Sequence, residues 1–478
     1  MGEFIWDEFL GFETSAWPAQ VLEWLAVLAP HTSHWQAPTD LAAAADFLET
    51  RRRFLSARSL RRRVLALRAI DPAAGAADAL AQADALSALA DNYTESSLGD
   101  AIRAHYVHAI ELLEVAWDLR CQYLGAADPL ALMTRARIPY GEAGRYWEGR
   151  QALEAVLKQA HALGANELRK VQAAYAYYLY EDGEFDTSRG LYQQLLAHTD
   201  LSLIEQATAH SLLGFIEYEA GHFEASRQAT THALTLLESN RSEPGPVHLL
   251  GTIELNLAMC LSAMSQHDKA LQAAIRAEQH FSQVMLPTDP WWGALYVDLA
   301  LVRIAAGDSV TGLKLTQRAA QVSEEGLGES HFEPTCAWLL QAWFCQQEGD
   351  AQRAVELVDR AVKVRRLTLP EGHWRRILAE ENLAYLLRAS GHTDRADAIV
   401  LRWASALVLE DFAWRLSLEA STRLLCRISA AQWRAGDPVQ ARRCIDLAFL
   451  RCESQGRADY AQRLMSIGKR MESGGQHG

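Results

Sequence analysis

Residues 382–396 read NLAYLLRASGHTDRA. Within this stretch Gly391 follows the small residue Ala384 by seven positions and precedes the small residue Ala396 by five. Glycine is the usual residue at the left-handed position that ends a helix. Small residues on either side of it allow two successive helices to approach closely. The stretch therefore predicts a helix, a tight turn and a second helix packed against the first.

The same arrangement recurs along the chain at intervals of 38 to 45 residues. The turns start at Gly144, Gly183, Gly221, Ser265, Gly307, Gly349, Gly391 and Gly436. Five residues after each start lies a small residue: Gly149, Ser188, Ser226, Ala270, Gly312, Ala354, Ala396 and Ala441. Seven residues before it the residue is small in all but the first case, where it is Arg137: Ala176, Gly214, Ala258, Ala300, Ala342, Ala384 and Ser429. A period of about 40 residues is typical of a stacked helical array. We therefore predict an all-α solenoid with eight repeats over residues 125–455.

These segments resemble the tetratricopeptide repeat (TPR), a helix–turn–helix unit. The long period and the Asn-Leu-Ala steps at 256–258 and 382–384 resemble the kinesin-light-chain variant of that repeat. Asp289, His331 and His373 lie in its inter-repeat loop position, each 18 residues before a turn, and are interpreted as loop or cap residues. The resemblance implies a right-handed superhelix whose first helices line a concave face. It also implies binding of other molecules.

The ends of the chain differ from the repeats. Residues 1–70 are predicted to form an N-terminal helical region, acidic over the first 50 positions and then arginine-rich over 51–68. The arginine-rich stretch is either part of a cap on the solenoid or a docking surface for an acidic partner or RNA. Residues 71–124 suggest a degenerate first repeat that turns near 92–99. Residues 456–478 suggest a capping helix and a short tail.

Composition and motifs exclude several classes of function. The net charge of −14 argues against general affinity for DNA or RNA phosphates. No apolar run reaches the length of a membrane span, and seven cysteines without a CxxC pair indicate a reduced, cytosolic protein. Phosphate-loop, zinc-protease and serine-hydrolase motifs are missing from the sequence. We therefore expect no cofactor, no metal and no enzymatic activity.

Candidate contact residues come from projecting the helical period onto the first helix of each repeat. Positions six, three and two residues before each turn share one helix face and hold most of the aromatic residues. The predicted partner-binding residues are Tyr177, Tyr180, Glu181, Phe215, Tyr218, Glu219, Trp343, Tyr385, Arg388 and Trp433. The N-terminal members, with Glu142 beside them, suit a peptide that carries Lys or Arg and apolar anchors. The C-terminal members, with Arg423 and Arg434, suggest an aromatic and more basic surface.

Three functions remain open from the sequence. The first is a cytosolic scaffold or adaptor, of a bacterial type by composition, that binds a protein or peptide in the solenoid groove and possesses surfaces for self-association. The second is a peptide-responsive regulator with an N-terminal effector region, an arrangement that resembles the Rap phosphatase and regulator family. The third is a biosynthetic enzyme with a site in the superhelix cavity. The sequence favours the first, because it offers recognition surface and no catalytic motif.

Overall fold

The computed structural model describes residues 41–43, 45–46, 54–67, 75–95, 102–140, 145–239, 247–285, 287, 289–406, 418–454 and 457–474. In these ranges all regular secondary structure is helical. The N-terminal helices are α4 (Phe54–Leu67), α5 (Ala76–Glu95), α6 (Ile102–Leu124), α7 (Pro129–Ala136), α8 (Tyr146–Leu157) and the short η4 (Ala160–Ala162).

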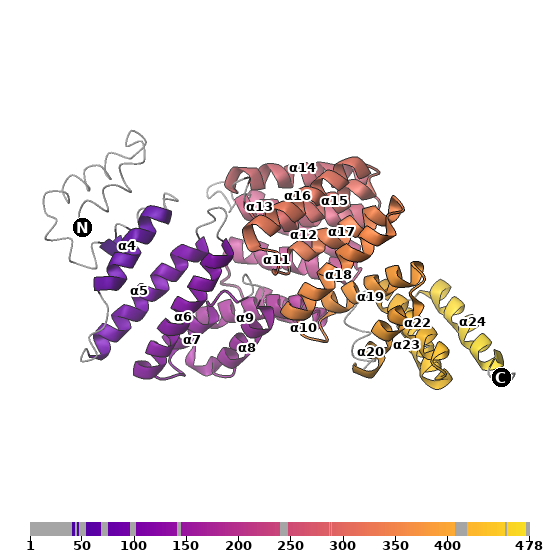
Figure 1. Cartoon of the computed structure of the whole chain (residues 1–478). Coiled ribbons are helices and arrows are strands. Elements are labelled where there is room, and N and C mark those ends of the chain that lie inside the picture. The colour runs from indigo at the N-terminus through magenta and orange to yellow at the C-terminus, as the bar shows by residue number, and fades with distance from the viewer. Residues whose placement is uncertain are drawn as a thin grey trace. The chain divides into compact units, whose positions relative to one another are not determined.

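The helices that follow form pairs along the chain, as Figure 1 shows. The pairs are α9 (Ala165–Glu181) with α10 (Phe185–Leu196), α11 (Leu203–Glu219) with α12 (Phe223–Ser239), α13 (Val247–Ala263) with α14 (His267–Val284), α15 (Trp292–Ala305) with α16 (Ser309–Leu327), α17 (Pro334–Gln347) with α18 (Ala351–Thr368), α19 (Trp374–Ala389) with α20 (Thr393–Ala406), and α22 (Leu418–Arg434) with α23 (Pro438–Ser454). Helix α24 (Ala458–Gly474) packs on α23. The prediction of an all-α repeat solenoid is confirmed.

Seven of the eight predicted turns lie in the described residues, and all seven have the same backbone conformation. The glycines at 183, 221, 307, 349, 391 and 436 have φ between 81° and 86°, and Ser265 has φ 59°. At Gly391 the amide N–H donates to the carbonyl of Arg388, and the next amide donates to the carbonyl of Leu387. This pair of bonds is the Schellman motif, and it satisfies the last carbonyls of the helix. The turn at Gly144 lies outside the described residues.

The small residues beside these turns are buried where one helix crosses the next. Ala258, Ala300 and Ala396 are fully buried. Ser188 donates a 2.6 Å hydrogen bond to the carbonyl of Ala176. The small residue after the turn at Gly183 thus contacts the small residue before it directly. A Cβ added at Gly214 would lie 2.3 Å from the Oγ1 atom of Thr230. The sequence pattern therefore marks the contacts that set the separation of the paired helices.

Contacts between repeats define two layers. Four consecutive first helices contact one another, α11 with α13, α13 with α15, and α15 with α17. Successive second helices, such as α12 and α14, have no comparable contact. A stack whose first helices lie closer together than its second helices must curve toward the first helices. The exposed side chains of α11, α13, α15 and α17 therefore belong to the inner layer of the curve.

The chain divides into two compact units, which are Met1–Ala143 with Glu148–Val171, and Gly144–Trp147 with Gln172–Gly478. In the first unit, Arg58 donates to Asn92, Arg61 pairs with Asp46 and Arg62 donates to the Tyr93 hydroxyl. These three arginines of the stretch 51–68 thus have partners within their own unit. The domain boundaries that we drew from the sequence stay a prediction.

Several sequence features fall outside the described residues. These are the acidic segment 1–40, much of the segment 41–53, the turn proposed within 92–99 beyond Glu95, Glu142, and the C-terminal residues 475–478. Among the described residues, no helix combines the length and the hydropathy of a membrane span.

Candidate functional site

The repeats of the second unit contact each other across a long stretch of chain. The indole Nε1 of Trp374, at the start of α19, donates a 2.8 Å hydrogen bond to the carbonyl oxygen of Glu181, at the end of α9. The guanidinium of Arg375 pairs with the carboxylate of Glu181. The ring of Trp374 also meets Phe185 edge to face, with centroids 6.1 Å apart. We call Glu181, Phe185, Trp374 and Arg375 the closure contact, because it joins the turn after α9 to the loop before α19.

The residues that we interpreted as loop caps have that role. Asp289, His331 and His373 are each at most 5% exposed. Each accepts a hydrogen bond from the backbone N–H two positions later, at 3.0 to 3.2 Å. Burial, reinforced by the charges of Arg375 and Arg365, lowers the pKa of His373 to about 3. A neutral imidazole can accept that hydrogen bond, so His373 is a structural cap.

Carboxylates gather beside the closure contact. Glu219, Asp298 and Glu333 keep partial contact with solvent, and none has a direct ion pair with another described residue. Burial raises the pKa of Asp298 to about 7, and the nearby charges of Glu219 and Glu333 add to the effect. Burial likewise raises the pKa of Glu333 to about 7, against the opposing charge of Arg375. Arg375 is thus the cation shared by this carboxylate cluster.

The N-terminal aromatic row is continuous, and its four rings range from exposed to buried. The rings of Tyr177 and Tyr180 lie 6.1 Å apart, those of Tyr180 and Phe215 5.3 Å apart, and Phe215 stacks on Tyr218 at 6.3 Å. Tyr177 is 38% exposed, whereas Tyr180 is only 2% exposed. Glu181 is buried in the closure contact. Tyr180 therefore packs in the core and Glu181 holds a guanidinium, while the partner-binding role predicted for both stays a prediction.

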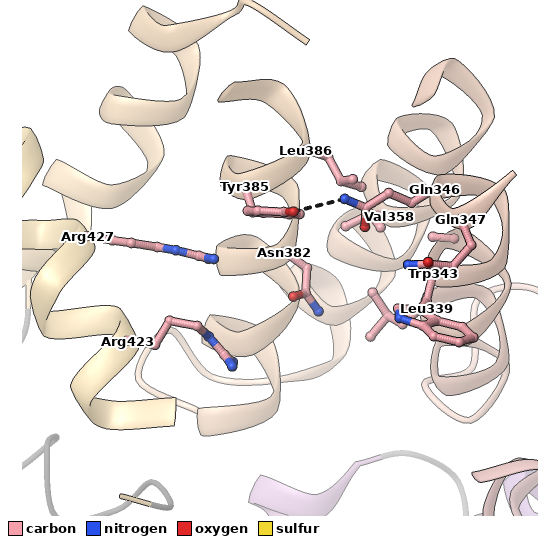
Figure 2. A pocket seen from close by; sticks show the side chains of 11 residues that line it. Leu339, Trp343, Gln346, Gln347, Val358, Asn382, Tyr385, Leu386, Arg423 and Arg427 are labelled. Carbon is pink, nitrogen blue, oxygen red and sulfur yellow. Dashed lines mark hydrogen bonds between the residues drawn. The ribbon is translucent and has the colours of Figure 1, made fainter. Parts of the chain in front are cut away.

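A groove of about 370 Å³ lies among the C-terminal repeats, shown in Figure 2. Its walls come from α17, α18, α19 and α22: Leu339, Ala342, Trp343, Gln346, Gln347, Val358, Asn382, Tyr385, Leu386, Arg423 and Arg427. Trp343 is 38% exposed and Tyr385 is 43% exposed, which is unusual for such large rings in a folded chain. The amide of Gln346 on α17 donates a 3.0 Å hydrogen bond to the hydroxyl of Tyr385 on α19, which links these two helices at the groove. The structure thus places two predicted contact residues, Trp343 and Tyr385, in one groove.

The two arginines that line the groove pair with the same buried carboxylate. Arg423 forms two hydrogen bonds with Glu381, at 2.8 and 3.2 Å, and Arg427 pairs with the same carboxylate at 2.8 Å. The guanidinium of Arg427 also lies over the ring of Tyr385, 5.1 Å from its centroid. Glu380, the neighbour of Glu381 in sequence, diverges from it and pairs with Arg366 at 2.6 Å. The two carboxylates therefore do not form a catalytic pair.

The remaining predicted contacts lie outside this groove. Arg388 pairs with Asp397, which also accepts two 2.7 Å hydrogen bonds from Arg434. Trp433 is 38% exposed and is not among the residues that line the groove. Phe215, Tyr218 and Glu219 lie with the carboxylate cluster and the aromatic row.

Sequence reasoning missed Asn382, Arg427 and Asp298. All three lie nine residues before a turn, at the same repeat position. That position is one i−3 step from the row six before the turn, so it shares a helix face with Trp343 and Tyr385. Extending the projected face by one step would have found them.

No protein-family model matches the chain, and no curated protein matches it. Among solved structures it is similar to BtubC (BKLC) from P. vanneervenii, at 18% identity over 47% of this chain and 88% of that chain, with a TM-score of 0.36. It is similar to the TPR-like repeats of a Podosopora anserina kinesin light chain, at 17% identity over 49% and 100%, with a TM-score of 0.31. It is also similar to a Rap protein complexed with competence and sporulation factor, at 14% identity over 91% and 99%, with a TM-score of 0.47.

The repeated Schellman turns, the buried small residues and the successive helix pairs define a helical-repeat solenoid. The fold is a TPR-like helical solenoid. Within this TPR-like solenoid, the groove is formed by the first helices α17, α19 and α22, together with Val358 of α18.

Proposed function

We propose that the chain is a non-enzymatic scaffold or adaptor that binds a protein or peptide through the groove of its second unit. The observation that carries the proposal is the groove itself. It exposes Trp343 and Tyr385 beside the amide side chains of Asn382, Gln346 and Gln347. Large half-exposed rings supply apolar contact area, and amides can pair with the backbone of an extended peptide.

The groove is small, and its wall has no reactive side chain. A volume of about 370 Å³ is at the low end for a ligand pocket. No wall residue is a serine, cysteine, histidine or carboxylate that could act as nucleophile or general base. The groove therefore offers recognition, and a segment of a longer chain can extend beyond its ends.

The proposal is tested by selecting short random peptides on the full-length chain. Each selected peptide is then synthesised, labelled with a fluorophore and titrated with protein while its anisotropy is measured. We expect the double variant Trp343→Ala, Tyr385→Ala to bind at least about tenfold more weakly, because both rings would be lost from the centre of the contact.

A matched control keeps the test specific. Leu367 is 84% exposed on α18 and does not line the groove. Leu367→Ala should bind like the wild type, and circular dichroism should show equal helicity for all variants. Equal affinity of the double variant and the wild type would contradict the proposal.

A further inference from the structure

We infer that the carboxylate cluster of the second unit binds a guanidinium group, presented by an arginine of a partner protein or peptide. The cluster consists of Glu219, Asp298 and Glu333 and lies beside the closure contact. It shares no residue with the groove, so it is a second site with a ligand chemistry of its own. The inference therefore goes beyond the function proposed above and can be tested separately from it.

The first observation is that the three carboxylates have no counter-ion in direct contact. Each keeps partial contact with solvent, and none forms a hydrogen bond or an ion pair with another described residue. The guanidinium groups whose charge acts on the cluster belong to Arg375 and Arg365. Arg375 pairs with Glu181 instead. Arg365 donates to the hydroxyl of Thr335 and to a backbone carbonyl. The cluster is thus left with negative charge that an incoming cation can meet.

The second observation is a buried hydroxyl group that also has no partner. The side chain of Tyr180 is 2% exposed, and its hydroxyl forms no hydrogen bond with another described residue. Burial raises the pKa of this hydroxyl, and the charges of Glu219, Glu181 and Asp298 raise it further, so the hydroxyl lies among these carboxylates. A buried polar group without a partner is destabilising. A ligand that donates several hydrogen bonds would satisfy the hydroxyl and the carboxylates together.

The arrangement of the carboxylates favours a flat organic cation over a metal ion. In the part of the chain that the structure describes, no group of three or more His, Cys, Asp or Glu side chains is placed to hold a metal. The carboxylates therefore do not converge on one small ion. A guanidinium group is planar, and its five N–H donors reach several acceptors at once. It is also more weakly hydrated than an ammonium group, which suits a site with only partial access to solvent.

Aromatic rings border the cluster and add a surface for a planar cation. Tyr218 directly precedes Glu219 at the end of α11. Burial raises the pKa of the Tyr218 hydroxyl, and the charges of Glu219 and Asp298 add to the effect. Phe215 stacks on Tyr218 with parallel rings, and both rings are half-buried, so part of each stays accessible. Guanidinium groups stack on such aromatic faces.

The cluster lies on the inner layer of the repeats. Glu219 is the last residue of α11, Asp298 lies on α15, and Glu333 is the N-cap residue of α17. These three helices belong to the run of first helices toward which the stack curves. A segment of another protein that enters the curve from inside would meet all three carboxylates.

The cluster lowers the stability of the fold, and no internal contact offsets this cost. Burial raises the pKa of Asp298 and that of Glu333 to about 7, and it also raises the pKa of Glu219. Groups that break a rule of folding without an internal compensation are expected at functional sites. A bound cation would favour the ionised carboxylates, so binding should release protons near neutral pH.

Other charged or titratable groups next to the cluster do not change their charge near neutral pH. They are Glu181, Tyr180, Tyr218, Cys336, Arg365 and Arg375. Burial raises the pKa of the two tyrosines and of the thiol, so these three stay neutral. Glu181 is paired with Arg375. The pH dependence of binding near neutrality therefore reports on the cluster itself.

The test uses the full-length chain and the probe Nα-acetyl-argininamide, whose only charge is its guanidinium group. Saturation-transfer NMR during a titration gives its dissociation constant. The uncharged Nα-acetyl-citrullinamide should bind at least about tenfold more weakly, as loss of a charge-assisted contact requires, and Nα-acetyl-lysinamide at least about threefold more weakly. Affinity for the arginine probe should rise about tenfold from pH 6 to pH 8, because the ionised fraction of a carboxyl group with a pKa of about 7 rises by that factor.

Protein variants assign the probe to the cluster. Asp298→Asn keeps the shape of the side chain and removes its charge, so it should weaken binding of the arginine probe about tenfold. Tyr180→Phe removes only the hydroxyl and should weaken binding about fivefold. Glu325 is an exposed carboxylate on α16, so Glu325→Gln is the control and should bind like the wild type. Circular dichroism should show equal helicity for all variants.

Peptides identify the source of the guanidinium group. Arginine-containing peptides selected on the full-length chain should bind more than about tenfold tighter than the single-residue probe, because flanking residues add contacts. Replacement of their arginine by citrulline should remove this gain. If no such peptide binds tighter than the probe, the ligand is a small free guanidine, and the inference is overturned.

The remaining outcomes separate this inference from the proposed function. An arginine probe that binds no better than the citrulline or the lysine probe overturns the inference. Unchanged affinity of both Asp298→Asn and Tyr180→Phe overturns it as well. The groove variant Trp343→Ala, Tyr385→Ala should leave binding of the arginine probe unchanged. Binding that depends on these two rings and not on Asp298 would place the probe in the groove, and it would overturn this inference while the proposed function stands.

Discussion

The carboxylate cluster predicts that stability depends on pH in a way that one substitution removes. Asp298 lies near Glu219 and Glu333, and burial is the main reason that its pKa rises from 3.8 to about 7. Each pKa unit is worth about 1.4 kcal/mol, which gives an upper limit of roughly 4 kcal/mol for the cost of ionising this group in the fold. Partial contact with solvent screens the charge, so we take a cost of about 2 kcal/mol.

The sign of the effect follows from proton binding. Between pH 3.8 and about pH 7 the folded chain binds a proton at Asp298 that the unfolded chain does not. The free energy of unfolding therefore falls as pH rises through this window. Above it, Asp298 is charged in both states and the full cost remains. Asp298→Asn removes the charge. It should therefore raise the free energy of unfolding by about 2 kcal/mol near pH 8, and by only about 1 kcal/mol near pH 4.5.

The measurement is urea unfolding followed by circular dichroism at both pH values. Glu325→Gln is the matched control, because Glu325 is an exposed carboxylate on α16. The control should change stability by less than about 0.5 kcal/mol at either pH. A gain for Asp298→Asn that is the same at both pH values, or no gain near pH 8, would refute the reasoning.

Three further predictions concern stability and are checked by urea unfolding. Arg375→Met leaves the buried carboxylate of Glu181 without its cation and should lower the free energy of unfolding by about 3 kcal/mol. The control Arg395→Met changes an exposed arginine and should lower it by less than about 0.5 kcal/mol. Equal losses in the two variants would argue against the closure contact. Gly214→Ala adds a Cβ that meets Thr230 and should cost about 1–3 kcal/mol. Gly190→Ala meets nothing within 4 Å and should gain up to about 1 kcal/mol, so a loss there would show that the clash is not the cause. Ser265→Gly should gain about 1 kcal/mol, since Ser265 is the one non-glycine residue with positive φ in the described chain; a neutral result would show that this turn is not strained.

The fold could be predicted from the sequence because its determinants are local. A turn residue such as Gly391 and the small residues Ala384 and Ala396 lie within fifteen positions of each other, and their meaning does not depend on the rest of the chain. The caps at His331 and His373 were recognisable for the same reason. Each uses a side chain and an amide only two residues apart.

The candidate site was only partly predictable, because its contacts are long-range. Trp343 and Tyr385 were found from the helical period, but nothing near Glu181 in the sequence indicates that Arg375 and Trp374 come to lie against it. The burial of Tyr180 depends on packing against Phe185 and Phe215 from other helices. A helical projection shows which residues share a face. It does not show which part of that face another element covers.

The hydrogen bond from Trp374 to Glu181 has a consequence for the order in which the chain comes apart. In a simple repeat array every unit is held by its immediate neighbours, so unfolding can start at either end and spread one unit at a time. Here the helices from α10 to α18 lie inside a loop whose ends are tied together, and opening any one of them disturbs the tie. Helices α20, α22, α23 and α24 lie beyond it. Amide protons inside the loop should therefore exchange as one slow block, while those of the last helices exchange faster and in graded steps.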